Sequence, residues 1–177
     1  MRLRCLIYLF LILLISQSAS AQVAEIPDPN LKQVLQDALN LPSNAPITQQ
    51  EMLKLERLNA GGNRGITDLT GLEYAINLKG LGLNHNPITD ISPLSHLTKL
   101  EGFNLWGCRI VDLSPLRNLK NLRSIILGNN RISDLSPLSE LTNLTFIELE
   151  SNRISDVSPL AGLINLTALQ LLSLIHI

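Results

Sequence analysis

The chain has 177 residues, of which 45% are hydrophobic, 16% are charged and only 3% are aromatic, and its formal net charge is −1. This length fits one domain. A charge so close to neutral argues against nucleic acid or an anionic membrane surface as the partner.

The first 21 residues have the pattern of a secretory signal peptide. Arg2 and Arg4 form a short basic start, residues 5–15 are an uncharged apolar run, and residues 19–21 read Ala-Ser-Ala, a small-residue cleavage site. The run is shorter than the roughly 20 apolar residues that cross a bilayer, so we expect no membrane span in the mature chain. Losing both arginines from the 14 Lys and Arg leaves 12 against 15 Asp and Glu, a net charge of −3. We therefore expect a secreted or cell-surface protein.

Residues 22–52 are expected to form a helical N-terminal cap. Apolar residues recur at helical spacing after Asp28 and Pro29, which fit the N-cap and the first helical position. Thr48 and Glu51 have the spacing of a capping box at the start of a second helix. Repeat arrays need a cap of this kind because the end of their core would otherwise face water.

From residue 53 to residue 171 the sequence repeats with a period of 22, through about five units and a partial sixth. Each unit reads Leu-x-x-Leu-x-Leu, then Asn or Cys, Ile, Asp and Ser-Pro-Leu; the first unit has one extra residue and lacks Ser-Pro. Apolar residues two apart point to one side of a short strand, and stacked strands bury that side. Ser-Pro fits an N-cap followed by the first residue of a short helical turn. The pattern predicts a right-handed α/β solenoid with a parallel concave sheet and short 3-10 or helical return arms.

These units resemble the internalin-like class of bacterial leucine-rich repeats. The matching text is LGLNHNPITDISPLSHLTKL, IILGNNRISDLSPLSELTNL and IELESNRISDVSPLAGLINL. The resemblance implies a curved solenoid with a helical cap, whose concave sheet binds a protein or a glycan. Because repeats of this class occur with many partners, the resemblance is specific for the fold and much less so for the function.

One polar column follows the strand of each unit, where the chain bends. A buried Asn at that bend can donate to and accept from the backbone of neighbouring turns. The members of this column are Asn86, Cys108, Asn130 and Asn152. We interpret Cys108 as a structural substitute with weaker hydrogen bonding, the alternative being a reactive thiol.

A second polar column carries one carboxylate in each unit. Its members are Asp68, Asp90, Asp112, Asp134 and Asp156. Such a column could bind calcium, but calcium loops cluster several oxygens within a short segment. The favoured interpretation is that each carboxylate accepts hydrogen bonds from backbone N–H groups of the following turn.

The outward positions of the strands are expected to form the binding face. Trp106, Ile126 and Phe146 occupy shifted columns of successive units, so they would form a diagonal with steps of roughly 8 Å across the sheet. Large apolar side chains on a rigid surface are typical binding anchors, although scattered surface hydrophobes are the alternative. The polar candidates on the same face are His85, Asn104, Arg123 and Glu148.

These observations predict a recognition module that binds a protein or a glycan, with no cofactor, no metal and no catalytic role. The repeat accounts for every Ser and Asp near His85 and His96, so no catalytic set remains. The alternative is an architectural spacer that displays a C-terminal domain missing from this fragment.

Residues 172–177 depart from the repeat. They lack the expected Asn bend and any polar cap, and Leu-Ser-Leu-Ile-His-Ile matches the translation of a transposon adapter used in sequencing libraries. We expect a non-native tail on a truncated chain; the alternative is a genuine short hydrophobic C-terminus.

Overall fold

The computed structural model describes residues 22–171. The signal peptide expected at 1–21 and the non-native tail expected at 172–177 both lie outside the described residues. Among the helices of residues 22–171, none has the length and apolar character needed to cross a membrane.

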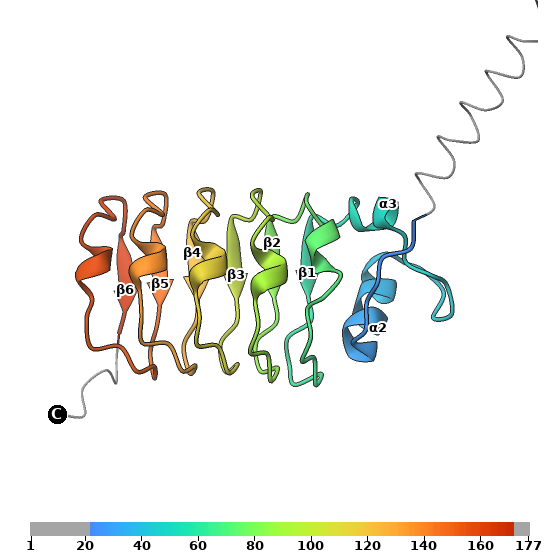
Figure 1. Cartoon of the computed structure of the whole chain (residues 1–177), viewed down its shortest axis with the longest axis horizontal. Coiled ribbons are helices and arrows are strands. Elements are labelled where there is room, and N and C mark those ends of the chain that lie inside the picture. Colours follow the sequence, from blue (N-terminus) through green and yellow to red (C-terminus); the bar gives the residue numbers. More distant parts are fainter. Residues whose placement is uncertain (1–21, 172–177) are drawn as a thin grey trace, which may run out of the picture.

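Two helices, α2 (Pro29–Ala38) and α3 (Gln49–Met52), lie before the first strand (Figure 1). Asp28 is the N-cap of α2, and its carboxylate accepts hydrogen bonds from the N–H groups of Asn30 at 2.9 Å and Leu31 at 3.0 Å. Thr48 and Glu51 form the reciprocal capping box at α3. Both predicted helix starts are therefore confirmed.

Six short strands form a single parallel sheet in chain order. They are β1 (Arg57–Asn59), β2 (Gly80–Gly82), β3 (Gly102–Asn104), β4 (Ser124–Ile126), β5 (Phe146–Glu148) and β6 (Ala168–Gln170). From β2 onward each residue pairs with the residue 22 positions later, whereas Arg57 pairs with Gly80, 23 positions on. The extra residue of the first repeat is thus absorbed before β2, and the predicted solenoid is confirmed.

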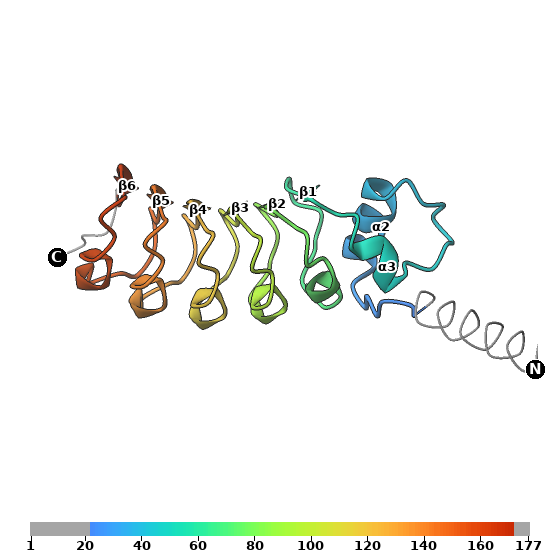
Figure 2. The ribbon, with the colours of Figure 1, turned by 90° about the horizontal axis from the view of Figure 1, so that it is seen from above.

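The return arms contain one 3-10 turn each. These are η1 (Leu72–Tyr74), η2 (Ser92–Leu94), η3 (Ser114–Leu116), η4 (Ser136–Leu138) and η5 (Ser158–Leu160). The strands line the concave side of the curved molecule and the 3-10 turns line the opposite side (Figure 2).

The assignment of serine as the N-cap of these turns is wrong by one position. Ile91 occupies the N-cap of η2, so Ser92 is the first helical residue and the proline is the second. The reason is that Asp90, two residues earlier, supplies the acceptor for the Ser92 N–H, so the serine is free to enter the helix.

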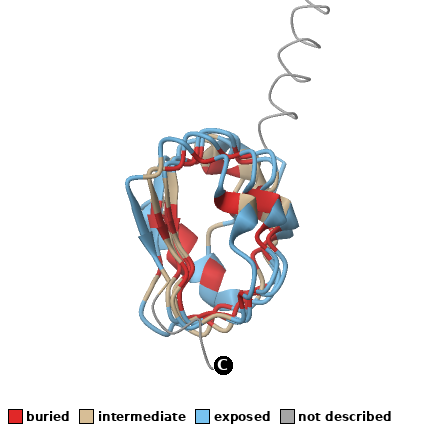
Figure 3. Ribbon diagram, turned by 90° about the vertical axis from the view of Figure 1, so that its left-hand side faces the viewer, coloured by how far each residue is buried: buried red, intermediate tan, exposed pale blue. Residues whose placement is uncertain are grey.

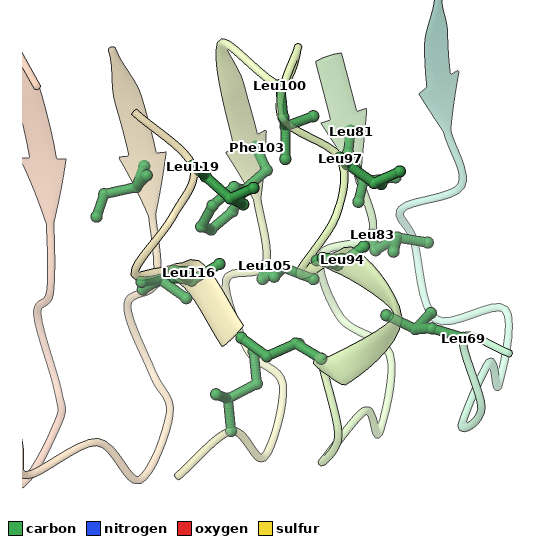
Figure 4. Packing of buried hydrophobic residues seen from close by; sticks show 14 of the residues in the cluster. Leu69, Leu81, Leu83, Leu94, Leu97, Leu100, Phe103, Leu105, Leu116 and Leu119 are labelled. Carbon is green, nitrogen blue, oxygen red and sulfur yellow. The ribbon is translucent and has the colours of Figure 1, made fainter. Parts of the chain in front are cut away.

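The core lies between the sheet and the return arms. Leu83 and Leu105 from the sheet side and Leu94 from η2 point into this space and are completely buried (Figure 4). Seen along the solenoid axis, buried residues line the inside of the coil and exposed residues lie on its outer surface (Figure 3). Burial decreases at β6, where Leu169 is 39% exposed, because no described strand covers its far side.

Candidate binding face

The concave face is made by the residues that alternate with the core residues of each strand. In β3 and β4, Phe103 and Ile125 are buried, while their neighbours Asn104 and Ile126 lie half-buried on the concave side. Asn104 is the register partner of Ile126, which in turn is the partner of Glu148 on β5. These three side chains therefore form a row across the middle of the sheet.

A hollow of about 350 Å³ opens on this face around Trp106. We call it the Trp106 hollow, and its lining residues are Asn84, His85, Asn104, Trp106, Ile126 and Glu148. The rings of His85 and Trp106 are in contact, with centroids 4.7 Å apart and an interplanar angle of 57°. This pairing fixes the indole at the edge of the hollow.

Gly128 makes room for the two side chains that define the hollow. A Cβ atom at this position would clash with Oε1 of Glu148 and would lie 2.6 Å from Cδ1 and 2.7 Å from Nε1 of Trp106. The indole and the carboxylate thus come from opposite sides and lie together over the Gly128 backbone. A larger residue at position 128 would push both away.

Glu148 is held in an unfavourable electrostatic setting. Burial, together with the neighbouring carboxylate of Glu150, raises the pKa of Glu148. The ion pairs found within residues 22–171 are Lys79–Glu56 and Lys120–Glu140, so neither Glu148 nor Glu150 has a cationic partner there.

A second hollow, of about 390 Å³, adjoins the first, and we call it the basic hollow. Arg57, Lys79 and Arg123 line it together with Glu101, and small residues form its floor. It shares Asn104 and Ile126 with the Trp106 hollow, so the two are adjacent, and we refer to them together as the depression.

The structure brings most of the predicted binding residues together. His85, Asn104, Trp106, Ile126 and Glu148 line the Trp106 hollow, and Arg123 lines the basic hollow. Phe146 lies on β5 beside Ser124 and is not among the residues that line either hollow. Of the three residues of the expected diagonal, Trp106 and Ile126 therefore lie in one site and Phe146 does not.

Three residues that line the two hollows were not among the binding residues expected from the sequence, namely Asn84, Arg57 and Lys79. A signal that could have found them is that the residue type changes from unit to unit at the outward positions of the strands. These positions do not contribute to the core, so packing does not constrain them. The role of Gly128 as the support of two side chains depends on the tertiary structure, so strand alternation alone could not show it.

The Asn column forms a ladder of buried hydrogen bonds. Asn130 accepts from the Ile110 N–H at 2.9 Å and donates to the carbonyls of Leu105 at 2.9 Å and Leu127 at 2.8 Å. Asn86 and Asn152 bond in the same pattern: each accepts from an N–H of the preceding turn and donates to one carbonyl of that turn and one of its own turn.

Cys108 interrupts this ladder. Its sulfur lies 3.7 Å from the Leu83 carbonyl, and because sulfur is a weak donor and acceptor its contacts are weaker than the hydrogen bonds of an asparagine. Burial raises the pKa of the Cys108 thiol, although the N–H groups of Asn86 and Ile88 act in the opposite direction. A buried, protonated thiol is a poor nucleophile, which supports the structural interpretation.

The Asp column makes local hydrogen bonds. In the four later units each carboxylate accepts from the backbone N–H and the hydroxyl of the serine two residues on. Asp68 accepts in the same way from Thr70. Within residues 22–171 no three His, Cys, Asp or Glu residues are grouped closely enough to hold a metal ion. The hydrogen bonds of these carboxylates are therefore those of a cap on the following turn.

The repeats match the family described as Leucine Rich repeats (2 copies) over residues 76–118, 98–140 and 120–165. Together with the solenoid geometry, this match shows that the chain belongs to the leucine-rich repeat family. No curated protein matches the chain.

Among solved structures the chain resembles internalins. An internalin (InlF) from Listeria monocytogenes is 32% identical over 81% of this chain and 49% of that chain, with a TM-score of 0.69. A second internalin of that species, InlC2, is 29% identical over 82% of this chain and 93% of that chain, with a TM-score of 0.48. A Leptospira interrogans leucine-rich repeat protein, 24% identical over 70% of this chain and 32% of that chain, shares the fold with a TM-score of 0.63. The chain spans about half the length of InlF.

Proposed function

We propose that this chain is an extracellular or cell-surface recognition module that binds a protein or a glycan on its concave face. The observation that carries the proposal is the Trp106 hollow, where an aromatic ring, an apolar side chain and several polar groups converge on a rigid parallel sheet. Rigid aromatic anchors surrounded by polar groups are the usual centres of binding surfaces.

Two further observations support the proposal. The similarity to InlF covers most of the chain, so this fold is used by a protein named as an internalin. The basic, apolar and small-residue pattern of residues 1–21 supports export of the mature chain.

The chain's tryptophan gives a direct test, because Trp106 is the only one in the sequence. The purified chain is screened on a glycan array and against purified cell-surface proteins, and each binder is then titrated while the tryptophan emission is recorded. We expect binding to shift or quench the emission, since the partner would cover the half-buried indole.

A matched pair of variants locates the binding. Trp106→Ala should weaken it, whereas Val111→Ala, which changes an exposed apolar residue outside the strands, should leave it unchanged. The concave-face proposal would be contradicted by a binder that does not change the tryptophan emission and that binds Trp106→Ala as tightly as the unaltered chain. A screen with no binder at all would favour the spacer role instead.

A further inference from the structure

We infer that the Trp106 hollow receives a basic side chain, Lys or Arg, from a protein partner that lies extended across the concave face. The inference rests on the proposed recognition function and specifies its ligand class. It is carried by the shape of the hollow together with the difference in charge between the two ends of the depression.

The Trp106 end is shaped for a cation. Glu148 reaches over Gly128 to the indole, and Glu150, two residues further along, is near enough to act on its charge. Neither carboxylate has a cationic partner within the described part of the chain. A basic side chain inserted beside Trp106 would compensate Glu148, the carboxylate that lines the hollow, and contact an aromatic ring, which attracts cations.

At the other end of the depression cationic side chains outnumber carboxylates, because Arg57, Lys79 and Arg123 line the basic hollow with Glu101 as its one acidic lining residue. Arg57 and Arg123 take part in neither ion pair of residues 22–171, while Lys79 is paired with Glu56 at 3.0 Å. The apolar side chain of Ile126 separates the two ends because it lines both hollows. The depression therefore presents the Glu148 carboxylate, an apolar side chain and guanidinium groups in succession.

This charge order favours a polypeptide over a glycan. A segment with a basic, an apolar and an acidic side chain in succession would pair with every part of the depression. A neutral oligosaccharide could hydrogen-bond to Glu148 and Arg123 but would bring no opposite charge to either, so it would lack the ionic part of the pairing. Arg123 is level with Thr145 in the register of β4 and β5, so Glu148 lies three residues, about 10 Å, further along the strand direction. In an extended segment of polyproline II conformation, side chains three residues apart share one face and lie about 9 Å from each other, so the acidic and basic side chains of the segment should be three residues apart.

The test is an array of blocked peptides, acetyl-Gly-Asp-Ala-Leu-X-Gly-amide, in which X is varied over all standard residues and norleucine. Norleucine has the apolar chain of lysine without its ammonium group, so it isolates the charge. Two neutral trisaccharides, maltotriose and chitotriose, are titrated alongside, and binding is measured by the emission of Trp106.

We expect peptides with Lys or Arg at X to bind about tenfold more tightly than the norleucine peptide, with an advantage that falls as salt is added. Glu148→Gln should remove most of this preference and leave the norleucine peptide unaffected. The control Glu140→Gln removes a carboxylate 80% exposed on a return arm and should preserve the preference.

Equal binding of the Lys, norleucine and Glu peptides, or no peptide binding, would overturn the inference. A preference that survives Glu148→Gln would overturn it as well. If a trisaccharide quenches Trp106 while the peptides do not, the basic-side-chain inference fails and concave-face recognition stands. If array-selected binders also leave the Trp106 emission unchanged, the proposed function itself fails.

Discussion

The two sides of the same sheet follow different rules along the chain. On the buried side, the middle residues of β2 to β5 are Leu81, Phe103, Ile125 and Ile147, all apolar. On the concave side, the next residues of the same strands are Gly82, Asn104, Ile126 and Glu148, which share no chemistry. The repeating side builds the solenoid, so the side that does not repeat is where selection for a ligand can act.

The largest expected effect comes from breaking the repeating side. Asn130→Ala removes the acceptor of the Ile110 N–H and the donor to two carbonyls, all in a buried turn. We expect a loss of about 1–3 kcal/mol in the free energy of unfolding because these backbone groups cannot reach water. Thermal and urea melts measure it.

The control for this variant is Asn121→Ala, which removes a single exposed bond to the Thr98 carbonyl. It should cost much less, since water can replace the lost donor. Identical melting of Asn130→Ala and the unaltered chain would show that the ladder does not stabilise the fold.

Gly128→Ala tests whether the concave side can be altered without harming the core. The new Cβ displaces Trp106 and Glu148, whose positions define the hollow. We expect about tenfold weaker binding of array-selected partners, equivalent to about 1.4 kcal/mol, and a shifted Trp106 emission.

Gly162→Ala is the matched change on a return arm, where the nearest atom to a new Cβ is 3.8 Å away. It should leave binding and emission as they are. Unchanged emission in Gly128→Ala would mean that the glycine does not position the indole.

Asp28, at the N-cap of α2, is a buried carboxylate whose electrostatic setting is the opposite of that of Glu148 on the concave side. Burial alone would raise the pKa of Asp28, but hydrogen bonds from the Thr67, Leu31 and Asp68 N–H groups outweigh it and lower the pKa. The ionised form of Asp28 therefore stabilises the fold at pH values above the pKa that this group has in the unfolded chain. This contribution is lost as the pH falls through the lower pKa that the group has in the folded chain.

Unfolding measured between pH 6 and pH 2 should thus show a stability loss that begins at about pH 4. In Asp28→Asn this part of the pH dependence should be flatter, with a loss of about 1 kcal/mol at neutral pH. If Asp28→Asn loses stability at low pH to the same extent as the unaltered chain, Asp28 is not the source of that loss.

The smallest effect is expected at the weak point of the ladder. Cys108→Asn should restore the missing bonds and raise the free energy of unfolding by up to about 1 kcal/mol. Comparing its melt with that of Cys108→Ser, a control with a small polar side chain, separates the full amide pattern from mere polarity. A lower melting temperature for Cys108→Asn than for the serine variant would contradict the ladder account.

The sequence was sufficient to predict the buried side of the sheet and its turns, because each repeated position has the same structural role in every unit. It also predicted the helix starts at Asp28 and Thr48, since capping depends on residues only a few positions apart. The second role of Asp28, as acceptor for the N–H of Thr67 at 2.8 Å, spans 39 residues and could not be read from local spacing.

The concave side was predictable only in part for a related reason. Strand alternation gives which residues face outward, and hence Trp106, Ile126 and Glu148. It does not give the direction in which a long side chain leans, so neither the convergence over Gly128 nor the exclusion of Phe146 from the two hollows followed from the sequence.

The central claim is that recognition and folding are assigned to opposite sides of one sheet. The most direct test measures melting and partner binding together for Trp106→Ala and Asn130→Ala. The account predicts that Trp106→Ala loses about 2 kcal/mol or more of binding free energy with nearly unchanged melting. Asn130→Ala should melt earlier but, while folded, bind normally. A Trp106→Ala variant that melts early and retains full affinity would contradict the account, because Trp106 would then belong to the structural side.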